Sequence, residues 1–200
     1  EGHAETVQVL LDRGADINQP SAGDKTTPLL SATINGHFDL ALELLKRGAD
    51  PRLASTGGTT PLFAAVNTRW APKARYPQQE AHKQQQATHL ELMEALLRSG
   101  ANPNARLTKH LWFMEYTFSH LGIDASGATP FWRATHALDV PAMKLLVEYG
   151  ADPGIPTTKG QDRRSRGGGG EDPSGLLPVP FGGPAIYPIH VGAGHGYGTG

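Results

Sequence analysis

Histidine is the residue type in this sequence that most directly suggests chemistry. The chain has nine histidines and no cysteine, so imidazole is available to bind metal, whereas thiolate zinc sites and disulfides are excluded. His82 and His89 are seven residues apart and would share one face of a single helix. His190 and His195 lack the acidic partners of a structural zinc site. We therefore expect no metal and no cofactor.

Motifs typical of enzymes are absent from the sequence. It has no Gly-x-Ser-x-Gly, no Gly-x-x-x-x-Gly-Lys and no His-Glu-x-x-His. The glycine run 167–170 lacks the Lys-Ser/Thr pair that binds phosphate and magnesium, and we interpret it as a linker. Arg163, Arg164 and Arg166 could contact nucleic acid, but a solvated charge run is the simpler interpretation. The chain is not expected to be an enzyme.

The charge balance gives no reason to expect a nucleic acid or membrane partner. The chain has 200 residues, with 18 Lys plus Arg against 19 Asp plus Glu, so it exerts no long-range attraction on polyanions. No apolar run approaches the roughly 20 residues that cross a bilayer as a helix. We expect a monomer, with no membrane span and no nucleic acid partner.

A cluster of aromatic residues lies in the segment 105–122. This segment is too apolar for a solvated loop, so we expect a short helix that packs on the rest of the chain. Trp112 and Tyr116 have two interpretations that stay open. They are either exposed anchors for a partner or half-exposed members of a small core. Phe113 and Phe118 are assigned to such a core.

Two short phrases recur along the chain and define the elements that must position these residues. Thr-Pro-apolar suits a helix start, because the hydroxyl caps free N–H groups and proline loses no hydrogen bond at the first position. Gly-Ala-Asp or Gly-Ala-Asn follows an amphipathic stretch and suits a helix end. The first phrase begins at Thr27, Thr60, Thr129 and, in weaker form, Tyr187. The second begins at Gly14, Gly48, Gly100 and Gly150.

Each unit therefore has two helices too short to be stable alone, and they must pack against the next unit. This pattern resembles the ankyrin repeat, whose signature is Thr-Pro-Leu-His-x-Ala, then Gly-His, then Gly-Ala-Asp. The signature histidine is replaced by Leu30, Phe63 and Trp132, and the larger side chains are expected to pack against the segment 105–122. The sequence predicts an all-α solenoid. The remaining signature histidines, His3, His37, His89 and His190, are expected to bond backbone groups at helix starts.

The resemblance divides the chain into units and insertions. We assign residues 1–155 to repeats, with a half repeat 1–18 and repeats at about 19–50, 51–104 and 105–155. Insertions interrupt them at about 69–87 and 105–122, residues 156–185 form a Gly/Pro-rich flexible insertion, and 186–200 begin a truncated repeat. Because both outer units lack a helix, we expect further repeats on both sides.

The insertions differ in composition. The first ends in helix-prone Gln, Glu, Lys and Ala, which predicts that the following helix extends from about Gln78 to Arg98. The third is expected to be mobile and to be cut first by proteases, between Gln161 and Gly175.

The resemblance implies that the chain binds another protein or peptide through loop tips and the concave face. The candidate inner-face residues are Ile34, Asn35, Asn67, Thr68, His136 and Ala137. The candidate loop-tip residues are Asp24, Lys25, Thr56 and Ser126, and aromatic candidates from the insertions are Trp70, Tyr76, Trp112 and Tyr116. The alternative is a non-catalytic regulatory or targeting region of a larger enzyme or signalling protein.

Overall fold

The computed structural model describes residues 3–70, 81–109, 111, 124–158 and 185–194. Helices are the only regular elements in these ranges. They are α1 (Ala4–Asp12), α2 (Pro28–Ile34), α3 (Phe38–Lys46), α4 (Pro61–Trp70), the 3₁₀ helix η1 (Ala81–Gln84), α5 (His89–Arg98), α6 (Pro130–His136), α7 (Val140–Glu148) and α8 (Pro188–Gly192).

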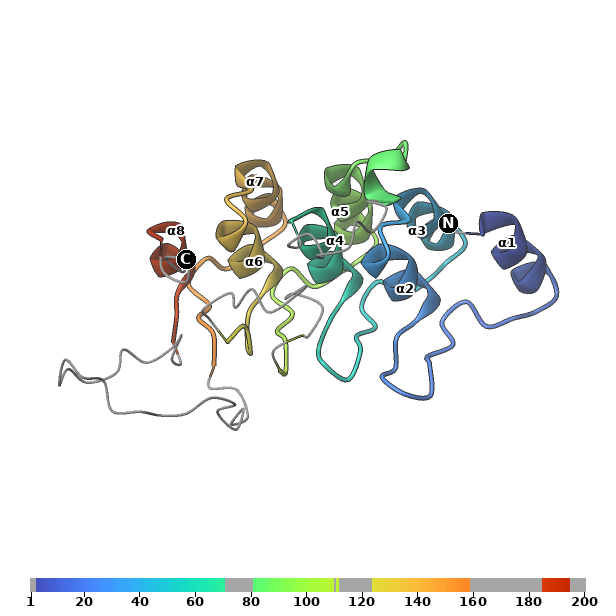
Figure 1. Ribbon diagram of the computed structural model, residues 1–200, viewed down its shortest axis with the longest axis horizontal. Helices are drawn as coiled ribbons and strands as arrows, with labels where there is room; N and C mark the ends of the chain where they lie inside the picture. Colours follow the sequence, from blue (N-terminus) through green and yellow to red (C-terminus); the bar gives the residue numbers. More distant parts are fainter. Residues whose placement is uncertain (1–2, 71–80, 110, 112–123, 159–184, 195–200) are drawn as a thin grey trace, which may run out of the picture.

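The helices form two rows along one axis (Figure 1). The inner row is α2, α4, α6 and α8, in which each helix contacts the next, and the outer row is α1, α3, α5 and α7. Each inner helix from α2 to α6 also packs on the outer helix that follows it in the chain. This arrangement confirms the predicted all-α solenoid.

The inner helices begin as the Thr-Pro phrase predicts. The Thr27 hydroxyl accepts a hydrogen bond from the N–H of Leu30 at 3.3 Å, and Thr129 accepts from Trp132 at 3.1 Å. At α8 the phrase has Tyr187, and its N–H donates to Nδ1 of His190 at 3.3 Å. Of the signature histidines, His190 therefore bonds a backbone group at its helix start, as predicted.

The outer helices end at left-handed glycines, and an asparagine joins successive units. Gly48 has φ 94° and Gly150 has φ 86°, which a side-chain-bearing residue rarely adopts. The Asp50 N–H donates to Oδ1 of Asn18 at 2.8 Å, so the end of one repeat is bonded to the preceding repeat. The Gly-Ala-Asp phrase therefore ends each helix and sets the register of the stack.

The main core lies between the two rows and includes buried residues of every α-helix from α2 to α7. A second cluster of buried residues lies beside it and includes Phe63 and Trp132, which replace the signature histidine. Leu107 and Leu111, from the segment 105–122, belong to the same cluster. The expectation that the two large aromatic side chains pack against this segment is therefore confirmed for its described residues.

The prediction of one helix from about Gln78 to Arg98 is wrong. The helix α5 begins at His89, because Thr88 forms a capping box with Glu91. The Thr88 hydroxyl accepts from the Glu91 N–H at 3.2 Å, and the Glu91 carboxylate accepts from the Thr88 N–H at 2.7 Å. These two bonds outweigh the weak helix propensity of the preceding residues. His82 lies in η1, so it does not share a continuous helix with His89.

Candidate partner-binding surface

The loops that precede the inner helices project from one side of the stack (Figure 1). In the first loop the Ser21 N–H donates to the Thr26 carbonyl at 2.9 Å, and Lys25 adopts a left-handed backbone. The Asp24 carboxylate accepts from the Ser21 hydroxyl at 2.7 Å and from the Thr26 N–H at 3.0 Å. These bonds, that of Ser21 foremost, lower the pKa of Asp24. The tip is therefore an ordered turn with an anionic, exposed end.

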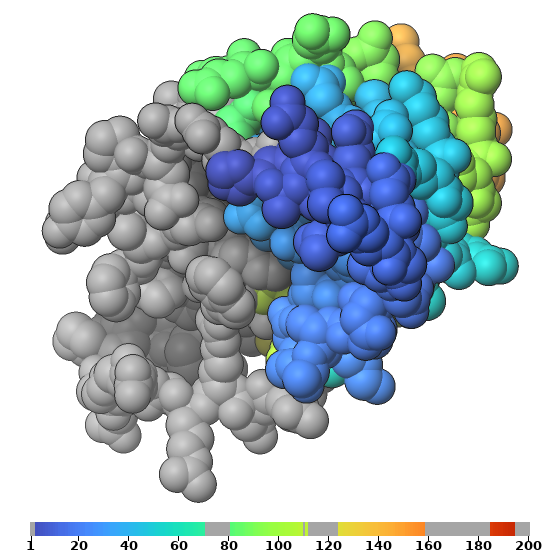
Figure 2. Space-filling view, turned by 90° about the vertical axis from the view of Figure 1, so that its right-hand side faces the viewer, coloured from blue at the N-terminus to red at the C-terminus, as the bar shows by residue number. Residues whose placement is uncertain are grey.

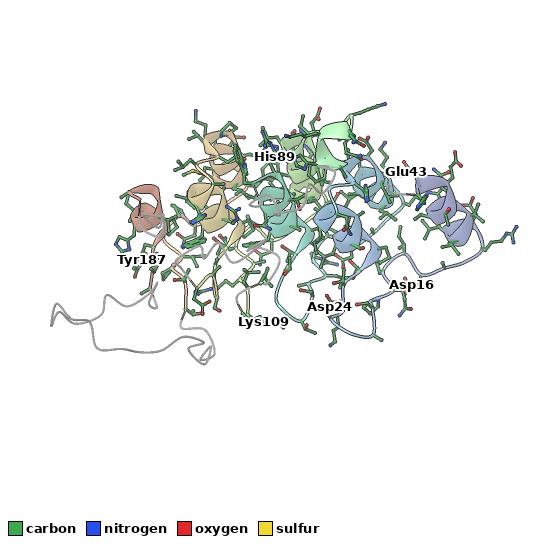
Figure 3. The ribbon with its side chains drawn as sticks, viewed as in Figure 1. Asp16, Asp24, Glu43, His89, Lys109 and Tyr187 are labelled. Carbon is green, nitrogen blue, oxygen red and sulfur yellow. The ribbon has the colours of Figure 1, made fainter. Side chains whose placement is uncertain are left out.

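Consecutive loops are joined by backbone hydrogen bonds into one layer. The Thr56 N–H donates to the Asp24 carbonyl at 2.8 Å, and the Thr108 N–H donates to the Gly57 carbonyl at 3.0 Å. The Thr158 N–H donates to the Ser126 carbonyl at 2.8 Å. Each of these bonds joins a loop to the loop before it. Asp24 and Lys109, labelled in Figure 3, both lie on this loop side of the molecule. The described parts of these loops are thus fixed relative to one another.

The described residues on either side of 110–123 lie next to those that precede 159–184. Leu107 pairs with Ala128, since its N–H donates to the Ala128 carbonyl at 3.0 Å. Arg106 bridges the two segments: its Nε donates to the Gly127 carbonyl at 3.0 Å, and its Nη2 donates to the Pro156 carbonyl at 2.6 Å. The predicted helix near 105–122 and the predicted mobile, protease-sensitive segment fall mostly on residues outside those described.

The described residues before and after the first insertion contact two different repeats. On one side Trp70 ends α4, and its indole Nε1 donates to Oδ2 of Asp139 in the α6–α7 turn at 2.7 Å. On the other side Asp39 of α3 accepts from the N–H groups of Gln86 and Ala87 at 2.9 and 2.8 Å. The described ends of this insertion therefore connect the repeat before it with the repeat after it.

The predicted site residues fall into three groups by exposure. Exposed or half-exposed are Asp24, Lys25, Ile34, Asn35, Thr56, Thr68, Trp70 and Ala137. Buried are Asn67, Ser126 and His136. Tyr76, Trp112 and Tyr116 lie outside the described residues. The surface candidates thus lie on the loop layer and the inner helices, whereas the buried ones cannot contact a partner unless the structure rearranges.

An open groove of about 560 Å³ brings some of these candidates together. It lies between the first loop and α2, towards the end of the stack that faces the reader in Figure 2. Asp24, Ile34 and Asn35 line it together with Ser31. Ser31 occupies the position that Arg133 has in α6, where that side chain packs on the preceding inner helix. The groove is therefore the helix-packing face of α2, and it does not have the form of an enclosed ligand pocket.

Contacts with Arg133 and Trp132 explain why Asn67 and His136 face inward. The guanidinium of Arg133 is buried, and its Nε donates to Oδ1 of Asn67 at 2.8 Å. The His136 ring stacks on Trp132, with ring centroids 5.5 Å apart. Burial, and secondly the charge of Arg133, lower the pKa of His136 to about 4, so this imidazole is neutral near pH 7. The Arg133–Asn67 bond joins α4 to α6.

Asp139 is the centre of a second polar cluster. In addition to Trp70, its Oδ2 accepts from Nε2 of His89 at 2.7 Å, and its Oδ1 accepts from the Ala142 N–H at 3.1 Å. Burial alone would raise the pKa of this carboxyl, but the hydrogen bonds from Trp70, Ala142 and His89 outweigh it and lower the pKa. His89, expected to bond a backbone group, bonds this carboxylate instead.

Reasoning from the sequence missed Arg133, Asp139 and Arg106. One signal was available for Asp139, because an aspartate directly before an apolar helix is a preferred N-cap. Arg133 carried a weaker signal, because it occupies an apolar position of its helix where a charge must find partners. No feature of the sequence marks Arg106 as a bridge between two loops.

The described residues contain no group of three or more His, Asp or Glu placed to bind a metal ion. Within the same ranges, every helix is too short or too polar to cross a membrane. Among the described side chains, the polar clusters around Arg133 and Asp139 join helices to one another.

Stacked helix pairs with a hydrogen-bonded layer of loops define a helical repeat protein. Residues 1–76 match the family model described as ankyrin repeats in three copies. The same helix pair, helix cap and terminal glycine recur after residue 76, in α6 and α7. Residues 1–76 are therefore ankyrin repeats, and the same repeat architecture continues in α6 and α7.

The curated relatives are longer proteins that contain this repeat. The chain is 26% identical over 152 residues to "Ankyrin repeat and SAM domain-containing protein 6" of Danio rerio, which covers 76% of the chain and 20% of that protein. It is 46% identical over 67 residues to "Protein HOS4" of Saccharomyces cerevisiae, covering 34% and 6%. It is 34% identical over 105 residues to "E3 ubiquitin-protein ligase hecd-1" of Caenorhabditis elegans, covering 52% and 4%. The chain thus spans a fifth or less of each of these relatives.

Proposed function

We propose that the chain binds a protein or peptide partner through its loop layer and the adjoining concave face of the inner helices. Ankyrin repeats generally mediate protein–protein interaction. The observation that carries the proposal is the set of backbone hydrogen bonds between consecutive loops, in which the carbonyls of Asp24, Gly57 and Ser126 accept. A layer fixed in this way presents its tips without an ordering cost on binding. The exposed side chains there are of mixed charge, which suits a protein surface better than a polyanion.

The proposal is tested by charge changes on exposed residues of the loops. The variant Lys25→Glu/Thr56→Glu alters two exposed tips, and Thr6→Glu/Lys46→Glu makes the same chemical changes on the exposed outer row. Each protein is used as bait in a lysate of the source organism, and captured proteins are quantified by mass spectrometry. The loop variant should lose at least one partner about tenfold, which corresponds to about 1.4 kcal/mol. Equal capture by both variants would overturn the proposal.

A second candidate is a non-catalytic region of a larger enzyme or signalling protein. The observation that favours it is the small share of the relatives that the chain covers, one of which is named as an E3 ubiquitin-protein ligase. In that case the loop layer would bind a substrate or regulator of a catalytic domain elsewhere in the protein. Reading the complete open reading frame decides between a scaffold and such a region. An open reading frame with no further domain would contradict this candidate.

A further inference from the structure

The α6–α7 turn has an exposed leucine in a backbone conformation that favours glycine. Leu138 has φ 56°, whereas the corresponding turn between α2 and α3 has Gly36 with φ 76°. Leu138 is 60% exposed and is not among the buried residues of the core. A strained residue that does not stabilise the fold points to a role outside it. Val140, two residues later, is 52% exposed and extends the apolar surface.

A tryptophan is fixed against the same turn. The Trp70 side chain is 39% exposed, and its indole nitrogen is bonded to Asp139, the residue between Leu138 and Val140. His89 and the Ala142 N–H bond the same carboxylate, which fixes its position. An immobilised, half-exposed tryptophan is typical of an interface hot spot, because binding costs it little conformational entropy.

Cationic side chains border this apolar surface. The guanidinium of Arg69 lies 4.5 Å from the centroid of the Trp70 ring, and Lys144 is exposed one helical turn after Val140. Neither forms an ion pair with another described residue. Glu148 is the acidic neighbour, one further turn along α7. Hence a complementary partner would carry an acidic side chain next to apolar ones.

The molecule itself shows how a short helix covers such a turn. A Cβ added to Gly36 would lie 2.9 Å from the backbone nitrogen of His82, so η1 packs directly on the α2–α3 turn. The His82 ring lies 6.1 Å from that of Phe38, which is buried. Val140 occupies the position of Phe38 in the α6–α7 turn but is half exposed.

From these observations we infer that Trp70, Leu138 and Val140, with Arg69, form a docking surface for a short acidic, amphipathic helix of a protein partner. This turn surface lies at the end of the helix pairs opposite to their connections with the loops. It is therefore separate from the loop layer, and the inference does not depend on the proposed function. The partner's apolar side chains would contact Leu138, Val140 and the indole, and its carboxylate would pair with Arg69.

The test uses a phage-displayed library of helical 14-residue peptides selected on the full chain. Enriched peptides are synthesised with a fluorescent label, and their affinity is measured by anisotropy. We expect enrichment of Leu or Phe at helical spacing next to Asp or Glu. The variants Arg69→Glu and Leu138→Asp should each weaken binding about tenfold or more. Leu10→Asp, which changes an exposed leucine of α1, and Lys25→Glu/Thr56→Glu should leave the affinity unchanged.

Leu138→Gly separates binding from folding. This variant suits the left-handed backbone and should fold with unchanged or higher stability, yet it should bind the peptides at least about threefold more weakly. Full affinity of Leu138→Gly would overturn the inference, as would selected peptides that lack acidic residues or bind elsewhere. Equal loss in the loop variant would show that the peptides occupy the loop layer instead.

Discussion

Leu138 and Gly36 occupy the same position in two turns, and only glycine is free of strain there. A left-handed backbone costs a non-glycine residue about 1–2 kcal/mol, although glycine also raises the entropy of the unfolded chain. We predict that Leu138→Gly raises the free energy of unfolding by up to about 1 kcal/mol, measured by urea denaturation. A loss of stability of similar size would show that the Leu138 side chain contributes to the fold.

His136 makes stability depend on pH. Its pKa is about 4 in the folded protein because of burial and the charge of Arg133, and it returns to about 6.5 in the unfolded chain. Between these values the unfolded state binds the proton and the folded state does not. The free energy of unfolding should therefore fall as the pH drops from about 6.5 towards 4. In His136→Gln this part of the slope should be absent, and an equal slope in both proteins would contradict the assignment.

Residue types and their burial explain which site residues could be predicted from the sequence. Asp24, Lys25 and Thr56 follow from the repeat register, which places them in loops that are exposed in the structure. The same register assigns Asn67 and His136 to the inner face, but both are buried, because Asn67 bonds Arg133 and the His136 ring stacks on Trp132. The Asn67–Arg133 pair joins two repeats across 66 residues of sequence, and no local pattern encodes it, whereas His136 stacks on a residue of its own helix.

At the scale of elements, the close contact between η1 and the α2–α3 turn can be measured. Gly36 and Gly48 both have left-handed backbones, but an added Cβ meets His82 at 2.9 Å only at Gly36 and nothing within 4 Å at Gly48. We predict that Gly36→Ala destabilises the protein about 1–3 kcal/mol more than Gly48→Ala, which isolates the contact from the strain. Hydrogen exchange of residues 81–88 should also accelerate in Gly36→Ala. Equal effects of the two substitutions would mean that η1 is not packed there.

The elements themselves were largely predictable, because their signals are local. The Thr-Pro caps and terminal glycines located the inner and outer helices, as the bonds of Thr27 and Thr129 confirm. The start of α5 differs from the prediction, because the capping box of Thr88 and Glu91 begins the helix there in spite of the helix propensity of the preceding residues. A specific cap decides a helix boundary more strongly than average propensity.

At the scale of the whole molecule, the stack depends on contacts between adjacent units. Oδ1 of Asn104 accepts from the Asp152 N–H at 2.7 Å, and its Nδ2 donates to the Gly150 carbonyl at 3.0 Å. We predict that Asn104→Ala costs about 1–2 kcal/mol and broadens the unfolding transition, because the last repeats uncouple from the first. Asn35→Ala, which removes an exposed hydrogen bond to the Ser31 carbonyl at the end of α2, should cost less. A sharp, unchanged transition in Asn104→Ala would argue against coupling at this point.

Recognition of a partner by the ordered loop layer can be measured by hydrogen exchange of the full chain, alone and with a captured protein partner bound. The account predicts that the partner slows exchange in residues 21–26 and 55–59 and in the inner helices α2 and α4, and leaves α3 and α5 unchanged. Protection confined to the outer helices, with loops that exchange at the same rate in both states, would contradict it.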